Sequence, residues 1–345
     1  MEPAIVKTIG ELFTQGSGIE IIREVAIEYL QSNENSLELI ENLFESIEPI
    51  EDTTIKCSLY DLVIDYSRLN GIMPYIAKGM YQKYLIERND FSRLKETYYS
   101  GKYVLNYVSF LPHEEQIELF YKLGVHAYNL RLYHDSIEHC KRIFAEDAGS
   151  SPYRVYALWV LRDAYFALGK YEESALYSLQ YKQFNYPSTQ DHVVLMEALF
   201  NAKKGNIALA TEQLLTFLKT CSDFFVFPAT KHLLELYLLQ KNFEGAKTVI
   251  ESSKVNSSML DEGNPSTYSE YADYLQLQGE YYLAIGDFDN FIRVLIDGAL
   301  NYSKINDTIK EKECLDMIIR NHLVQKIPMR ESTLEKLSNY YTQGI

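Results

Sequence analysis

The sequence predicts an all-α fold, a right-handed superhelical solenoid built from repeated helix pairs. Two observations favour it. Proline interrupts helices, and prolines recur here at intervals of 40, 35, 41 and 37 residues, at Pro112, Pro152, Pro187, Pro228 and Pro265. Hydrophobic residues make up 47% of the chain, and 29 tyrosines stand against 16 glycines, which suits packed helices better than a turn-rich β fold.

The segments between these prolines share an internal turn. Turns are expected at Arg131, Gly169, Gly205, Lys241 and Gly286. Two residues after each turn stands a bulky side chain, in chain order Tyr133, Tyr171, Ile207, Phe243 and Phe288. Three residues further on, four units have a small residue (Ser136, Ser174, Ala210 and Ala246) and the fifth has Phe291. The pattern, clearest in YFALGKYEESALYSL at 165–179, resembles the tetratricopeptide repeat.

The repeat sets the expected domain organisation. A unit of 34 or more residues holds two helices of three to four turns, and such units bury their apolar stripes by stacking. We expect repeats over 71–301, including a weaker unit at 74–98 that turns at Asn89. Residues 1–70 are helical by their apolar spacing, as degenerate pairs or as an N-terminal cap. Residues 302–345 are expected to form C-terminal capping helices.

Charge and targeting signals narrow the class of protein. The net charge of −15 argues against a bare nucleic-acid binder, because such a domain needs a basic face. No stretch of 18 apolar residues and no signal peptide is seen, so we expect a cytoplasmic protein without membrane contact. The four cysteines are scattered and never paired as CxxC, which is typical of buried thiols.

The chain lacks the short motifs of phosphate-binding loops, metalloproteases and serine hydrolases. The sequence has no GxGxxG, GxxxxGK[ST], HExxH or GxSxG pattern. His134 and His139 are five residues apart and so do not share a helix face. Asp287 and Asp289 lack the ligand set of a calcium loop. The sequence therefore predicts no catalytic residue, no cofactor and no metal, and a binding protein in place of an enzyme.

In a solenoid of this type the inner surface is formed by one face of the first helix of each pair. The repeat register places inward Tyr121, Tyr128 and Asn129, then Trp159, Asp163 and Phe166, then His192 and Lys203, then Lys231 and Glu235, and finally Asp273 and Glu280. Aromatic, amide and charged side chains together suit an extended peptide, since an Asn side chain can pair with both backbone N–H and C=O. The alternative is that the aromatics only pack between helices.

Arg162 stands where neighbouring units have Gly124 and Gly279. A guanidinium near the inner groove could clamp a peptide carboxylate in bidentate fashion. Alternatively, it forms an ion pair with a glutamate of the adjacent helix.

The segments FYKLGVHAYNLRLYHDSIEHCKRIF, LRDAYFALGKYEESALYSLQYKQFNYP and LIDGALNYSKINDTIKEKECL carry a family resemblance. Residues 115–343 are similar to the Gram-positive peptide-pheromone receptors, the Rap, NprR, PlcR and PrgX group, with NprR the most similar. The resemblance implies a quorum-sensing receptor that binds a short signalling peptide in its concave groove. Binding would switch transcription, the sporulation phosphorelay or both. Inward asparagines hold the peptide backbone in this family, which implies that role for Asn129 and Asn201.

The resemblance also implies partners. They are the peptide, a phosphorelay protein and a second copy of the chain, in a dimer or higher homo-oligomer that depends on the peptide. DNA would be bound only through a Cro-type helix-turn-helix, and residues 1–70 show no clear version of it. The chain is then a receptor piece without that domain or a Rap-like member that acts on proteins. An alternative function is a TPR adaptor without a peptide switch.

Overall fold

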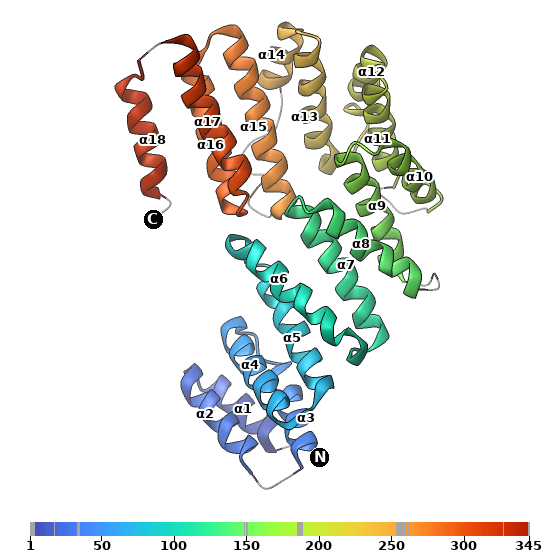
Figure 1. Cartoon of the computed structure of the whole chain (residues 1–345), viewed down its shortest axis with the longest axis vertical. Helices are drawn as coiled ribbons and strands as arrows, with labels where there is room; N and C mark the ends of the chain where they lie inside the picture. The colour runs from blue at the N-terminus through green and yellow to red at the C-terminus, as the bar shows by residue number, and fades with distance from the viewer. Residues whose placement is uncertain are drawn as a thin grey trace. The chain divides into compact units, whose positions relative to one another are not determined.

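The computed structural model describes residues 4–16, 18–32, 35–147, 149, 151–184, 189–252, 260, 263–326 and 328–343. Within these ranges the chain forms α-helices and two short 3₁₀ helices and no strand, which confirms the all-α class (Figure 1). None of these helices combines the length and apolar character that a bilayer crossing requires. Pro187 lies outside the described residues.

The chain divides into two compact units, and each is built from two stretches of sequence. The first comprises Met1–Ala127 and Glu138–Arg154, and the second Tyr128–Ile137 and Val155–Ile345. Helices of the first unit are α1 (Ala4–Thr14), α2 (Ile19–Leu30), α3 (Ser36–Ile47), α4 (Thr53–Asn70), α5 (Met73–Glu87), η1 (Phe91–Arg93), α6 (Leu94–Val104) and η2 (Leu105–Phe110). The helices α7 (His113–Asn129), α8 (Tyr133–Glu146) and α9 (Pro152–Ala167) each contribute residues to both units.

Local signals fix the ends of α4 in the first unit. The carboxylate of Asp52 accepts hydrogen bonds from the backbone N–H groups of Thr54 (2.8 Å) and Ile55 (3.0 Å), which caps the helix start. Gly71 ends the helix with φ 68°, a conformation that glycine adopts without strain. Between these caps, α4 packs against α5. Helices α1 to α5 thereby enclose one apolar core.

A tight contact joins α5 and α6. A Cβ atom on Gly101 would lie 2.3 Å from Cε2 of Tyr84, so only glycine fits there. The Tyr84 hydroxyl donates to Nδ1 of His126 (3.2 Å), and Nε2–H of His126 donates to the carbonyl of Leu94 (2.8 Å). Burial, followed by the charge of Arg88, lowers the pKa of His126 to about 4. The imidazole is therefore neutral and structural.

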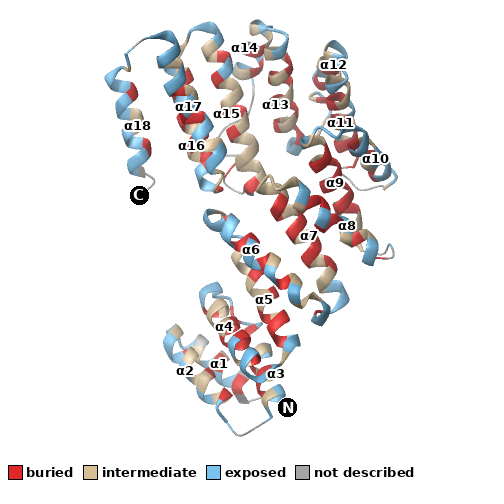
Figure 2. Ribbon diagram, in the orientation of Figure 1, coloured by how far each residue is buried: buried red, intermediate tan, exposed pale blue. Residues whose placement is uncertain are grey.

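The second unit continues the helix pairs. Its remaining helices are α10 (Tyr171–Tyr181), α11 (Thr189–Lys203), α12 (Ile207–Phe217), α13 (Asp223–Leu239), α14 (Phe243–Ser252), α15 (Pro265–Ile285), α16 (Phe288–Lys304), α17 (Thr308–Gln325) and α18 (Glu331–Gln343). Figure 1 shows α13, α15 and α16, coloured yellow to orange, side by side, and these neighbours contact one another. Buried residues follow α9 and α13 (Figure 2).

The predicted repeat register is confirmed by backbone geometry. All five predicted turn residues have positive φ: Arg131 (58°), Gly169 (72°), Gly205 (86°), Lys241 (54°) and Gly286 (79°). The five bulky residues that follow are the first residues of α8, α10, α12, α14 and α16. The residues three positions further on, small in four units and Phe291 in the fifth, are fully buried. Small side chains there let paired helices approach closely.

The role predicted for one proline was wrong. Pro152 and Pro265 begin α9 and α15, and Pro112 directly precedes α7, as the spacing predicts. Pro228, in contrast, lies inside α13, which begins at Asp223. Buried neighbours on both sides of Pro228 anchor this turn of helix to the core, and packing thus overrides the local preference.

Candidate functional site

All ten residues predicted to bind a peptide belong to the second unit. Their helices and positions are Tyr128 and Asn129 at the end of α7, Trp159, Arg162, Asp163 and Phe166 on α9, Asn201 and Lys203 on α11, and Lys231 and Glu235 on α13. These four are the first helices of their pairs. Six of the ten gather in two places: Phe166, Lys203 and Glu235 at one cavity, and Trp159, Arg162 and Asp163 around Arg162.

The Glu235 cluster (Phe166, Lys203, His232 and Glu235) borders a small cavity. Phe166 comes from α9, Lys203 from α11, and His232 and Glu235 from α13. The apolar part of the lining is Leu199, Ala202, Ile207, Leu236 and Leu239. The structure therefore brings three of the ten predicted residues, from three successive first helices, to one cavity.

A hydrogen bond and an ion pair hold Glu235 at the charged side of this cavity. Nδ1–H of His232 donates to Oε2 of Glu235 (3.1 Å), and Nζ of Lys203 lies 3.5 Å from Oε1. The hydrogen bond from His232 is the largest cause that lowers the pKa of Glu235, to about 2, with Lys203 and Lys231 adding to it. Glu235 is therefore a carboxylate at neutral pH, with about one third of its side chain exposed.

The cavity is large enough for one side chain. Its volume is about 70 Å³. A water molecule needs roughly 10–15 Å³ by the same measure, so about five waters or one leucine-sized side chain would fit. Phe166 forms one apolar wall, and Nζ of Lys203 lies 6.0 Å from the centre of its ring. Apolar walls with a few polar groups at the edge are typical of ligand sites.

His232 was missed in the sequence. Only its spacing of three residues from Glu235 could have indicated it, because i and i+3 residues are neighbours on a helix surface.

The Arg162 cluster (Trp159, Arg162, Asp163 and His192) is buried more deeply. Arg162 is only 2% exposed, and its Nε donates to Oδ1 of Asp163 (2.7 Å). Its Nη2 donates to Nδ1 of His192 (3.4 Å), and its guanidinium lies 5.6 Å from the ring centre of Tyr181. The ring of Trp159 packs on His192 at 4.7 Å. Neither Arg162 alternative describes this: the guanidinium is not on an open groove, and it pairs with Asp163 of its own helix instead of a glutamate.

Arg162 keeps one unused donor. Its Nη1 is buried and has no hydrogen-bond partner among the described residues. The α10 residue Ser174 donates its hydroxyl to the backbone carbonyl of Arg162 (2.8 Å), so the two helices stay close although the glycine of other units is absent. A buried cation with an unused N–H favours an acceptor from a ligand or a water at this point.

The other predicted residues differ in their availability. Tyr128 packs against Tyr133 (5.6 Å between ring centres), and burial followed by the charge of Asp163 raises its pKa. The Asn201 amide donates to Gln213 of α12 (2.9 Å). In the described part of the chain the half-buried amide of Asn129 has no hydrogen-bond partner, so it can meet a ligand backbone.

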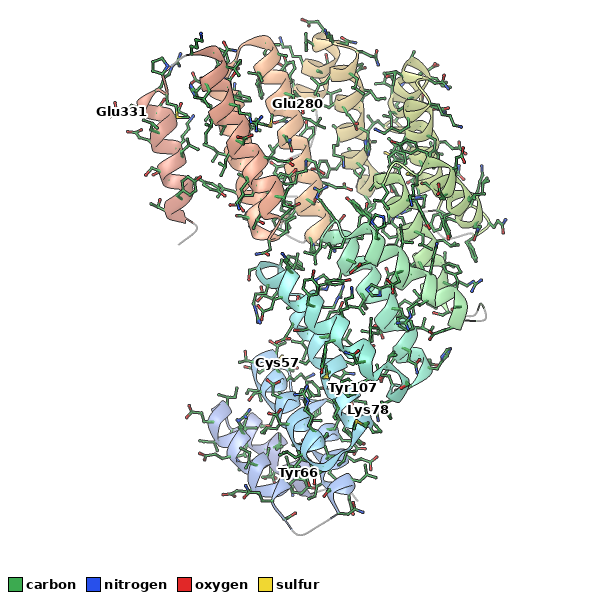
Figure 3. All side chains as sticks on the ribbon, in the orientation of Figure 1. Cys57, Tyr66, Lys78, Tyr107, Glu280 and Glu331 are labelled. Atoms are coloured by element: carbon green, nitrogen blue, oxygen red, sulfur yellow. The ribbon has the colours of Figure 1, made fainter. Side chains whose placement is uncertain are left out.

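Three further positions were placed on the inner surface by the register. Glu280, labelled on α15 in Figure 3, is exposed, and partial loss of hydration followed by repulsion from Glu235 raises its pKa. Tyr121 belongs to the first unit, where its ring lies 5.2 Å from that of Tyr153. Asp273 is engaged by Arg131, as described below. Whether any of these residues contacts a ligand stays a prediction.

In the ranges that the structure describes, no group of three or more His, Cys, Asp or Glu side chains is arranged to hold a metal ion.

Comparisons with known proteins bear on the fold. No family model matches the chain. No curated protein sequence matches it either. A tetratricopeptide repeat protein from Parabacteroides merdae is 16% identical with a TM-score of 0.59, over 81% of this chain and 98% of that one.

Two further solved structures are similar over most of their length. The apo form of RapI is 15% identical with a TM-score of 0.47, over 94% of this chain and 99% of its own. A Rap protein complexed with Competence and Sporulation Factor is 10% identical with a TM-score of 0.47, over 96% and 98%. The fold assignment rests on the Parabacteroides protein and on the repeat geometry, and together they establish a tetratricopeptide-repeat architecture.

Proposed function

We propose that this chain is a receptor that binds a short peptide along α9, α11 and α13 of its second unit. The observation that carries the proposal is the cavity at which Phe166, Lys203 and Glu235 converge from these three helices. Successive first helices are the elements whose faces form the inner surface of a repeat solenoid. A peptide that crosses them would meet both an apolar cavity and a charge pair.

The chemistry of the site defines the ligand class. One leucine-sized apolar side chain would enter the cavity, and the partly exposed Lys203–Glu235 pair would meet charges of the peptide beside it. The Asn129 amide would pair with the peptide backbone.

The proposed output is regulatory. Peptide binding in the cytoplasm would switch transcription, the sporulation phosphorelay or both, through a phosphorelay protein and a peptide-dependent homo-oligomer. The resemblance of residues 115–343 to peptide-pheromone receptors supports this part of the proposal. A ligand changes an equilibrium of this kind only if it binds one state more tightly than the other.

Isothermal titration against a synthetic library of unmodified hepta- to decapeptides tests the binding step. We expect at least one sequence class with an apolar anchor to bind with a dissociation constant in the micromolar range or below. Ala202→Leu would fill the cavity and should abolish this binding, whereas Ala208→Leu, on the exposed surface of α12, should not. Loss of binding in both variants would show that the loss does not come from filling the cavity, and would contradict the proposed site.

A second matched pair of variants tests the contribution of charge to peptide binding. Lys203→Ala should weaken binding about tenfold, the size expected for one hydrogen bond to a charged group. Lys204→Ala, one residue on and without an ion pair among the described residues, should leave it unchanged. The adaptor function is supported instead if no peptide of the library binds and a pull-down from cell extract recovers a stable protein complex that added peptides do not dissociate.

A further inference from the structure

Arg131 connects parts of the second unit that are far apart in sequence. It stands in the turn between α7 and α8. Its Nε donates to Oδ2 of Asp307 (2.9 Å), and its Nη2 donates to the hydroxyl of Ser269 (2.8 Å) and to Oδ1 of Asp273 (3.2 Å). Ser269 and Asp273 belong to α15, and Asp307 precedes α17. One guanidinium thus holds the α7–α8 turn against α15 and the α16–α17 turn.

The acceptors of this guanidinium are themselves fixed in place. The Tyr302 hydroxyl donates to Oδ1 of Asp273 (2.5 Å). Asp307 caps α17 by accepting from the backbone N–H of Lys310 (3.2 Å). Arg131 is 30% exposed and Asp307 only 14%, so water and salt screen these bonds less than they screen a surface ion pair.

The backbone conformation at Arg131 disfavours any residue other than glycine, which indicates that the contacts of the Arg131 side chain compensate for it. Glycine occupies the equivalent position in three of the other four predicted turns, and φ at Arg131 is 58°. A residue with a Cβ atom is strained in this conformation and glycine is not. Lys241, the other exception, is exposed and forms no ion pair within the described residues. Arg131 therefore combines an unfavourable backbone position with three long-range hydrogen bonds.

The neighbours of Arg131 include two residues of the proposed binding site. Asn129 and Tyr128 lie two and three residues before it, and the charges of Asp163 on α9 and Glu270 on α15 both act on the Tyr128 hydroxyl. Release of the turn from α15 would therefore change the surroundings of Tyr128 and Asn129. Without Arg131, the carboxylates of Asp273 and Asp307 would lose the cation that lies between them.

We propose that Arg131 is a latch with two states: closed, with the α7–α8 turn held on α15 and the α16–α17 turn, and open, with these bonds released. The latch is a property of the second unit and does not depend on a ligand. Its effect on Tyr128 and Asn129 rests on the proposed function. A ligand that binds one state more tightly would shift the population toward that state.

Double electron–electron resonance between two nitroxide labels tests the latch without any peptide, because it measures the distance between the α7–α8 turn and the start of α17. The labels are placed at His134→Cys, beside the turn, and Thr308→Cys, at the start of α17, in a chain that carries Cys57→Ser and Cys221→Ser. Cys140 and Cys314 are buried and are left in place. We expect one main distance in the parent chain and, in Arg131→Gln, a longer distance whose population rises about tenfold or more, as expected for the loss of a charged hydrogen-bond donor.

Two variants keep the test decisive. Arg131→Gly removes the guanidinium but favours the turn backbone, so it should show the longer distance even if Arg131→Gln folds poorly. Lys241→Gln, at the equivalent position of the α13–α14 turn, should leave the distance unchanged. An unchanged distance in both Arg131 variants, or the same change in Lys241→Gln, overturns the latch. Neither result bears on whether a peptide binds at the cavity.

Discussion

Nη2 of Arg162 lies 3.4 Å from Nδ1 of His192. A guanidinium can only donate hydrogen bonds, so Nδ1 of the imidazole accepts and carries no proton. Burial, followed by the charge of Arg162, lowers the pKa of His192 from 6.5 to about 4. The pair therefore combines one cation and one neutral ring inside the second unit.

Replacement of Arg162 should partly reverse the lowering of the His192 pKa. In Arg162→Met we expect the pKa of His192 to rise toward 6.5 without reaching it, because burial is the larger cause and persists. Histidine ring signals followed by NMR between pH 3 and 8 give the value. His126, whose pKa of about 4 has its own causes in the first unit, serves as the internal reference and should not move. An unchanged His192 would mean that the guanidinium does not act on it.

Glu235 makes stability depend on pH. Its folded-state pKa of about 2 is below the ordinary 4.5, so its contribution is complete above pH 4.5 and is lost as the pH falls from 4.5 toward 2. One third of the side chain is exposed, and we discount the effect to about 1 kcal/mol for solvent screening. Urea unfolding of Glu235→Gln should show this loss at pH 7 and a smaller one at pH 3. An equal loss at both pH values would assign the effect to packing.

The contact of Gly101 with Tyr84 predicts a strong packing effect in the first unit. In Gly101→Ala the new methyl would overlap the buried Tyr84 ring, and we expect a loss of about 2–3 kcal/mol in unfolding free energy. At Gly10 of α1 an added Cβ would have no atom within 4 Å, so Gly10→Ala should gain up to about 1 kcal/mol from helix propensity. Thermal unfolding of the two variants compares them directly. A loss of similar size in both would contradict the close contact.

Two equivalent turns should respond to substitution with opposite signs. Gly205 has φ 86° and nothing within 4 Å of an added Cβ, so Gly205→Ala should cost about 1 kcal/mol through backbone strain alone. Lys241 has φ 54°, and Lys241→Gly should remove such strain and stabilise by a few tenths to about 1 kcal/mol. Urea midpoints of both variants measure the signs. Destabilisation by Lys241→Gly would show that its side chain makes a contact of its own.

Most of the repeat architecture could be predicted because its signals are local. A turn at Gly169 or Lys241, followed by a bulky residue and then a small one, specifies a helix pair within a short stretch of sequence. The same reasoning failed at Pro228, where the packing of buried residues on both sides of the proline keeps α13 helical. Propensity is a weak prior that such packing overrides.

The candidate site was harder to predict because its geometry is made by contacts between helices. The register placed Phe166, Lys203 and Glu235 on successive first helices, and they do meet at one cavity. It could not show that Arg162 turns inward to Asp163 and His192, since a side-chain direction depends on neighbours. It also gave Arg131 only as a turn residue, because Asp307 lies 176 residues further along the chain.

The second unit is built from two separate stretches, Tyr128–Ile137 and Val155–Ile345. The polypeptide consequently passes between the units three times, and neither can be transplanted into another gene as one uninterrupted cassette. A fragment that begins at Val155 would contain Asp273 and Asp307 but not the arginine that they bind. Protein engineers who wish to study the repeats alone would need to retain residue 128 onward, together with the 17 residues of the first unit that lie between the two stretches.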